Sequence, residues 1–164
     1  MARDILKYHS AFLNSEYLAS VKEYTPPEVK VITEDYRAGA MDGSRSVDMG
    51  IEPMEFELKM GALEVVALRE VGKMGDARVT VRGAVERIDG STVAIVHTLG
   101  VRLKGGSRGA WAAGSMPEPT LSGSVHYFKE EVDDEVTTEI DIDNLIRIVD
   151  GVDQMEEIRN ALGL

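Results

Sequence analysis

The most restrictive feature of the sequence is a strict alternation of apolar and polar residues at 54–60. Met, Phe, Leu and Met alternate there with Glu, Glu and Lys. A period of two is that of a β-strand with one buried face. Residues 28–36 are rich in β-branched side chains and predict a second strand just before it.

Between these two strands lies a glycine-rich stretch at 36–50 that has little with which to fill a core. Connections of that length are uncommon in compact domains and are usually functional or disordered. The stretch has turn-forming residues but no run of charges. We therefore expect a long arm that docks on another surface.

Strand signals recur along most of the chain, and hairpin turns separate them. Asn14-Ser15, Asp89-Gly90 and Asp133-Asp134 are the predicted turns. Residues 1–8 are expected to be a loosely held lead-in, Pro26-Pro27 to break the chain, and Gly105–Met116 to form a loop. The predicted strands span 10–21, in two short pieces, 77–88, 91–106, 120–132 and 135–143.

Two stretches have apolar residues at helical spacing. Residues 61–72 predict a helix ending at Gly72, with a buried strand as the alternative because two valines are poor helix formers. Residues 142–164 predict short C-terminal helices. Within them, Asp153 precedes Glu156 by three residues in the manner of a capping box, and Gly163 ends the last helix.

These elements predict one domain over residues 1–164 that is mainly β. The expected architecture is an antiparallel β-sandwich or barrel with one flanking α-helix, short C-terminal helices and a long β-hairpin arm. A chain of 164 residues with 43% hydrophobic residues is long and apolar enough to bury a core. No apolar run approaches the roughly 18 residues needed to cross a bilayer, and the first residues lack the apolar region of a signal peptide.

The net charge of −11 is unevenly distributed, because twelve acidic and three basic residues lie between Lys129 and Leu164. An acidic protein does not grip phosphate backbones by releasing counterions. Tight nucleic-acid binding is therefore disfavoured, whereas a surface past which nucleic acid slides is not. The chain has no cysteine, which excludes disulfides and thiolate metal sites and fits a reducing cytoplasm.

A search for catalytic and ligand-binding motifs gives no positive result, so no catalytic, cofactor or metal residue is predicted. His9, His97 and His126 are scattered without the spacing of a zinc site, and we interpret them as structural. The glycines at 105–109 lack the phosphate-loop pattern, and the acidic run at 130–135 lacks EF-hand spacing. Trp111 is interpreted either as an anchor for a partner or as a plug at the end of the core.

Two stretches of the sequence are distinctive: YRAGAMDGSRSVDMG at 36–50 and IDIDNLIRIVDGVDQMEEIRNALGL at 140–164. Each resembles a signature of the major tail tube proteins of contractile-tailed phages. Their order and their spacing from both termini match the family. The loop at 105–119 does not align with the family pattern, and its role is left open.

The resemblance implies a structural protein of the virion, made in the bacterial host cytoplasm. It implies hexameric rings that stack into a tail tube, enclose the tape-measure protein and conduct DNA as cargo that does not stick. Sheath protein, baseplate and tail terminator are the other implied partners, and no membrane anchor or cofactor is implied. We expect the arm to contact the next ring through Tyr36, Arg37, Gly39, Met41, Gly43, Arg45, Val47, Asp48 and Gly50, with Arg37 and Arg45 paired to acids of the adjoining subunit.

Two other functions remain open at this point. The chain resembles the inner tubes of type VI secretion systems and phage-tail-like bacteriocins as well. A soluble acidic binding module that uses the arm to hold one partner would also fit, and it would stay monomeric.

Overall fold

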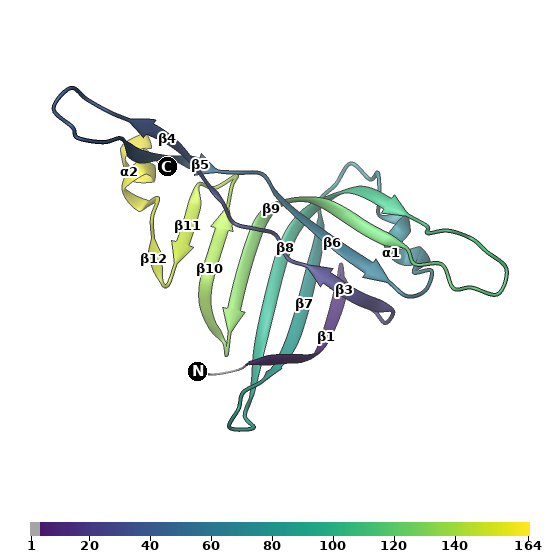
Figure 1. Cartoon of the computed structure of the whole chain (residues 1–164). Helices are drawn as coiled ribbons and strands as arrows, with labels where there is room; N and C mark the ends of the chain where they lie inside the picture. Colours follow the sequence, from purple (N-terminus) through teal and green to yellow (C-terminus); the bar gives the residue numbers. More distant parts are fainter. Residues whose placement is uncertain (1–3) are drawn as a thin grey trace.

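The chain folds into one large antiparallel β-sheet with a separate hairpin and two short helices (Figure 1). The computed structural model describes residues 4–164. The helices are α1 (Val65–Arg69) and α2 (Glu156–Leu162). The strands are β1 (Ile5–Leu13), β2 (Glu16–Leu18), β3 (Val21–Thr25), β4 (Val31–Tyr36), β5 (Arg45–Ile51), β6 (Met54–Met60), β7 (Ala77–Glu86), β8 (Thr92–Ser107), β9 (Thr120–Val132), β10 (Glu135–Asp141), β11 (Ile146–Val149) and β12 (Val152–Asp153).

The sheet forks at strand β9. One edge of β9 pairs with β8 over its whole length, from Thr120 to Val132. The other edge is divided: the first half pairs with β6, up to Val125 opposite Met54, and the second half pairs with β10, beginning at Tyr127 opposite Asp141. The two branches therefore separate at His126, whose carbonyl accepts a hydrogen bond from the backbone N–H of Ile142 at 3.0 Å.

The sheet also curls back on itself. Strand β2 lies at one end of the path β12-β11-β10-β9-β8-β7-β1-β2, and β3 pairs with β6 on the other branch. Only two residues connect β2 to β3, so the chain crosses from one edge to the other almost directly. No ladder joins β2 to β3 among residues 4–164, and the sheet is not a closed barrel. The prediction of a mainly β, antiparallel, sandwich-like fold is confirmed.

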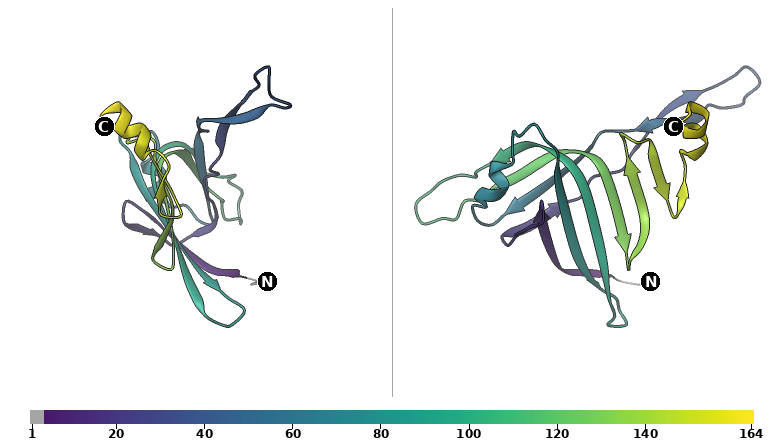
Figure 2. Two further views of the ribbon diagram at one scale, coloured as in Figure 1. Left: turned by 90° about the vertical axis from the view of Figure 1, so that its left-hand side faces the viewer. Right: turned by 180° about the vertical axis from the view of Figure 1, so that it is seen from behind.

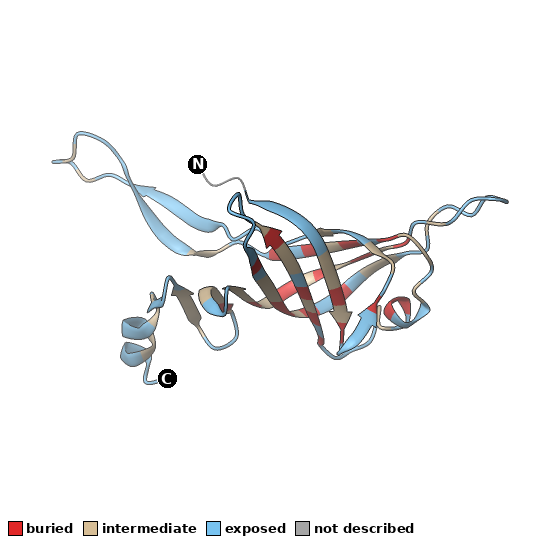
Figure 3. Ribbon diagram, turned by 90° about the horizontal axis from the view of Figure 1, so that it is seen from below, coloured by how far each residue is buried: buried red, intermediate tan, exposed pale blue. Residues whose placement is uncertain are grey.

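The core fills the inside of this curl (Figure 3). The alternation at 54–60 places Met54, Phe56, Leu58 and Met60 inside, each no more than 2% exposed. Every second residue of the facing strands completes the cluster, namely Leu13, Val79, Leu99, Val101 and Leu121. Each side chain buried to this extent stabilises the folded protein by roughly 1.5–3 kcal/mol. The curled sheet is therefore the stable part of the molecule.

The predicted hairpin turns are confirmed. Asn14 and Ser15 have φ of 48° and 70°, and Asp133 and Asp134 have φ of 54° and 66°. Two consecutive residues with positive φ match the twist of a two-residue hairpin, and Asn and Asp tolerate that conformation better than most residues. Asp89-Gly90 lies in the turn between β7 and β8 as expected.

The helix expected at 61–72 is present but shorter, as α1. It buries Ala67 and Leu68, and the Glu64 side chain accepts hydrogen bonds from the N–H and hydroxyl of Ser20. Its C-cap is Glu70, so Gly72 is not the cap that was predicted. The first four residues of the expected helix lie before α1. The backbone N–H of Gly61 donates a hydrogen bond to the Ser20 carbonyl, so the chain is still held beside β3 at that point.

The prediction of a helix that begins at residue 142 was wrong for residues 142–153. Residues 146–149 form strand β11, and Asp150-Gly151, with φ of 50° and 77°, turn the chain into β12. Only one C-terminal helix, α2, is present, and Gly163 ends it in the left-handed region as expected. The capping box was also wrong, because the N-cap is Met155 and Asp153 instead binds the Met155 N–H and the Arg159 guanidinium.

Three other boundaries differ from the prediction. Strand β1 begins at Ile5, so the lead-in prediction was wrong for residues 5–8, and its first three residues lie outside the described part. Strand β8 continues to Ser107, into the expected loop. Strand β3 was not predicted as a separate element; it lies before Pro26-Pro27 and forms the edge beside β6.

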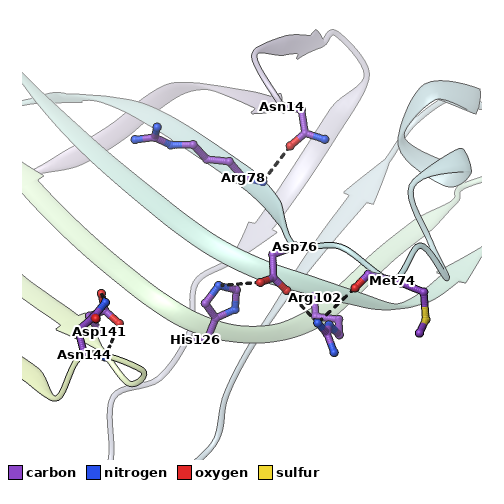
Figure 4. A network of polar contacts seen from close by, with 8 residues as sticks. All are labelled: Asn14, Met74, Asp76, Arg78, Arg102, His126, Asp141 and Asn144. Atoms are coloured by element: carbon purple, nitrogen blue, oxygen red, sulfur yellow. Dashed lines mark hydrogen bonds and ion pairs between the residues drawn. The ribbon is translucent and has the colours of Figure 1, made fainter.

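Polar contacts hold the ends of the strands in place (Figure 4). The amide oxygen of Asn14 accepts a hydrogen bond from the backbone N–H of Arg78 at 2.9 Å, which joins the first hairpin to β7. Asp76 lies 3.3 Å from the Arg102 guanidinium and 3.8 Å from the His126 ring. These contacts join the residue before β7 to Arg102 on β8 and to His126 on β9, close to the fork.

The close approach of β8 and β9 depends on Gly123. A Cβ on this residue would collide with the backbone carbonyl of Arg102, whereas nothing among the described residues lies within 4 Å of such an atom on Gly43. We predict that Gly123→Ala lowers the free energy of unfolding by about 1–3 kcal/mol, because backbone must move to relieve the collision. Chemical denaturation measures this, with Gly43→Ala as the matched control; equal stability of the two variants would contradict it.

Candidate assembly surfaces

The arm is a β-hairpin formed by β4 and β5 that projects from the end of the molecule (Figure 1). Tyr36 pairs with Arg45, so residues 37–44 are the only loop in the stretch predicted as an arm, and the rest of that stretch is strand. All six residues of β4 are exposed, as are the first five of β5. A two-stranded hairpin with both faces in solvent is marginally stable by itself.

The two faces of the arm differ in character. Cross-strand partners share a face, so Tyr36, Arg45, Glu34 and Val47 lie on one side and Asp35, Ser46 and Asp48 on the other. The second side is polar, and Ser46 donates a hydrogen bond to Asp35 at 3.1 Å. We call the first side, with Tyr36, Arg45 and Val47, the outer face.

The tip and root of the arm have their own local contacts. At the tip, Arg37 donates to the Met41 carbonyl at 3.4 Å, and the Met41 N–H donates to the Ala38 carbonyl. At the root, the register shifts so that Met49 and Gly50 together oppose Ile32, and Gly50 has φ of 114°. This is a β-bulge, and it is where glycine is required; Gly39 and Gly43 do not adopt positive φ.

One ion pair joins the arm to the C-terminal strands. The Arg147 guanidinium on β11 lies 2.6 Å from one oxygen of Asp48 and 3.5 Å from the other. The Arg147 side chain is 11% exposed and that of Asp48 is 49% exposed. The hydrogen bonds from Arg147 and from the Gly50 N–H lower the pKa of Asp48 below its usual value of 3.8. The ion pair thereby ties the polar side of the arm, at its root, to β11.

Beside this ion pair lies a groove of about 600 Å³ between the arm root, the ends of β10 and β11, and the start of α2. We call it the fork groove, since it opens where the two branches of β9 separate. Its lining is largely apolar and consists chiefly of Met49, Ile51, Ile142, Ile146, Met155 and Ile158. Met49, Ile142 and Ile158 are each about half exposed.

The turn that forms one wall of the fork groove is strained. Leu145 has φ of 53°, a conformation that bulky side chains rarely adopt. The Leu145 carbonyl accepts a hydrogen bond from Arg159 of α2 at 2.8 Å, and Asp141 accepts two hydrogen bonds from Asn144. These hydrogen bonds offset the conformational free energy of the strained backbone at Leu145. They also hold the wall of the groove in one conformation.

The opposite end of the molecule carries a second projection, at residues 108–117 (Figure 2). We call it the Trp111 loop. Trp111 is 74% exposed and Met116 is 78% exposed, so the tryptophan does not plug the core. Of the two interpretations of Trp111 from the sequence, only that of an anchor for a partner stays open.

His97 has a hydrogen-bond partner at each ring nitrogen, whereas the buried Nε2 of His9 has none among the described residues. His97 lies between Tyr24, whose hydroxyl is 3.0 Å from Nδ1, and Glu130, whose carboxylate is 2.9 Å from Nε2. Because a carboxylate only accepts, Nε2 donates to Glu130. Phe128 packs edge-on against the ring. Residues 4–164 contain no cluster of three or more metal-ligating side chains and no helix long and apolar enough to span a bilayer.

The predicted arm residues thus lie on one hairpin, but they do not form one surface. Asp48 and Gly50 serve the root, whereas Tyr36, Arg45 and Val47 lie on the outer face. Arg45 has no ion pair with any residue at 4–164. Sequence reasoning missed Arg147, Leu145 and Ile158 as parts of a surface. The Asp150-Gly151 turn signal would have revealed the strand that carries Arg147.

Comparison with known proteins gives a match over nearly the whole chain. The sequence model of a family described as phage tail tube protein FII matches residues 3–163. The tail tube protein of Escherichia phage P2 is 32% identical over 166 residues, which cover 97% of this chain and 96% of that protein.

Solved structures share the fold at low sequence identity. A chain of the sheath/tube terminator of an extracellular contractile injection system, PVC, in the extended state, matches with a TM-score of 0.60. It is 8% identical, and the match covers 75% of this chain and 92% of that one. A chain of the PVC sheath-tube complex matches with a TM-score of 0.58 and 9% identity, over 75% and 87% of the two chains. The full-length family match confirms the resemblance found in the sequence: the chain belongs to the phage tail tube protein FII family.

Proposed function

We propose that the chain is a single tail-tube domain that assembles into hexameric rings, and that these rings stack into the inner tail tube of a virion. The tube encloses the tape-measure protein during assembly and later conducts DNA. Sheath protein surrounds it, and baseplate and terminator proteins close its ends. The protein is made in the host cytoplasm, and its role is structural rather than catalytic.

The observation that carries this proposal is the exposed arm in a chain of this family. A hairpin with no buried face gains stability by packing on something else, and its strand edges are suited to pairing with a second chain. The outer face offers Tyr36 and Val47 for apolar contact and Arg45 for an acidic partner. In a protein whose relative in phage P2 is a tail tube protein, a second copy in the adjoining ring is the partner we assign.

The charge of the chain suits the passage of DNA. With a net charge of −11, acidic residues that face the lumen repel phosphates and let the DNA slide. The fold shared with chains of the PVC contractile injection system also fits the inner tube of such a system. The 32% identity to the phage P2 protein over the full length favours the phage tail.

The first prediction concerns a variant that lacks the tip of the arm but keeps its two strands. Replacing residues 37–44 by Asn-Gly leaves the Tyr36 and Arg45 pair joined by a two-residue hairpin turn. We expect the variant to fold and to form at most single rings, whereas the unaltered protein forms stacked tubes. Negative-stain electron microscopy over a concentration series measures this, and circular dichroism checks the fold. Normal tubes from the folded variant would refute the role of the tip.

The second prediction compares two neighbouring positions on opposite faces of β5. Val47→Lys places a charge on the outer face and should raise the critical concentration for tube formation at least about tenfold, as loss of a central contact does. Ser46→Lys is the matched control, because its side chain lies beside Asp35 on the other side. Sedimentation across a dilution series measures both. An equal effect of the two substitutions would show that the outer face is not the contact surface.

The third prediction concerns the ion pair that orients the arm. Arg147 lowers the pKa of Asp48, so the pair is fully formed above the usual aspartate pKa and is lost as the pH falls through the lower value in the folded protein. We expect the Asp48 carboxyl carbon, followed by NMR, to titrate with a midpoint below 3.8, and Arg147→Gln to raise that midpoint. An unchanged midpoint in the variant would show that the pair does not hold the arm.

A further inference from the structure

Two surface features have no role in the contact made by the arm: the Trp111 loop and the fork groove. The arm root, β11 and α2, which line the fork groove, lie at the end of the molecule opposite the Trp111 loop (Figure 1 and the right panel of Figure 2). One is a projection and the other is a hollow. The two features are complementary in shape and polarity.

The Trp111 loop has the composition of an inserting segment. Trp111 is the only tryptophan of the chain and is flanked by glycine and alanine, so no large neighbour covers it. Arg108 is the only charged residue from 105 to 117. Exposed tryptophan and arginine are the residue types most enriched among the contacts that dominate protein interfaces.

The fork groove has the complementary properties. Its volume of about 600 Å³ lies within the range of roughly 300–1,000 Å³ typical of pockets that bury an organic ligand, and an indole ring is smaller than such a ligand. Its lining is largely apolar and also contains the charged residues Asp48, Asp141 and Arg147. The segment at this end, residues 141–164, carries six acidic residues against two basic ones. A loop whose only charge is positive is attracted to such a rim.

A knob at one end and a hole at the other form a heterologous contact, and a heterologous contact closes into a ring when its rotation allows. We propose that the Trp111 loop of one subunit inserts Trp111 into the fork groove of the next subunit in the same ring, with Arg108 over the acidic rim. The partner is therefore a second copy of this chain. This inference rests on the proposed ring assembly and adds the contact that closes the ring, separate from the arm that stacks one ring on the next.

The absence of cysteine allows a direct test by cross-linking. Ala112 lies next to Trp111 in the loop and is exposed, and Gln154 is exposed at the groove. A double variant, Ala112→Cys with Gln154→Cys, is assembled and treated with a short bis-maleimide. We expect a ladder of covalent oligomers on a denaturing gel, because each subunit is linked to the next around the ring.

The control pair keeps the loop cysteine and moves the other one. Ala112→Cys with Ile88→Cys places the second thiol at the exposed tip between β7 and β8, away from the groove (Figure 1). This pair should give no ladder. Trp111→Ala, in the background of the double variant, should weaken the ladder and raise the critical concentration for rings at least about tenfold.

The outcomes separate this inference from the function on which it rests. Rings or tubes in the electron microscope without a ladder from the 112/154 pair would overturn the loop-in-groove contact and leave the tube assembly standing; the groove would then be free for another tail protein. Failure of the unaltered protein to form any ring or tube would overturn both. Rings together with a ladder specific to the 112/154 pair would establish the contact.

Discussion

The structure depends on the way strand β9 divides its outer edge between two partners. Because β6 takes the first half and β10 takes the second, the two branches part at His126. The arm returns to the sheet at Met54, directly beside that point, and the C-terminal strands leave it at Asp141. The arm and the C-terminal strands are therefore brought to the same end of the molecule. The fork groove and the ion pair between Asp48 and Arg147 both follow from this one branching.

The distribution of burial separates a stable body from surfaces that lack a partner. The curled sheet buries a continuous apolar cluster, whereas the arm, the apolar side of α2 and the Trp111 loop leave large hydrophobic side chains in solvent. Exposed apolar surface of this kind marks sites of interaction. The stacked rings that we propose need one contact around the ring and another along the tube, and in this proposal each of the two projections supplies one of them. The strained Leu145 turn fits this division, because it shapes a surface that adds nothing to the core.

Much of the sheet could be predicted from the sequence, because period-two alternation and the turns at Asn14-Ser15 and Asp133-Asp134 reflect burial and backbone conformation directly. The C-terminal segment was predicted wrongly from the sequence. Ile142, Leu145, Ile146 and Val149 have helical spacing, but three of the four are β-branched, and Asp150-Gly151 is the same turn signal that was used at Asp89-Gly90. The arm residues were found, but not their division into two faces. That division depends on the register of β4 with β5 and on the bulge at Gly50, and spacing along one strand does not reveal either.

The central claim of this account is that the arm and the Trp111 loop make two different contacts between copies of the chain. A cryo-electron microscopy reconstruction of tubes grown from the purified protein tests it most directly. The account predicts hollow stacked rings in which the outer face of each arm lies on the adjoining ring and each Trp111 lies in the fork groove of its neighbour within the ring. Tubes in which the arms point into solvent, or in which the fork grooves hold no part of a second subunit, would contradict it.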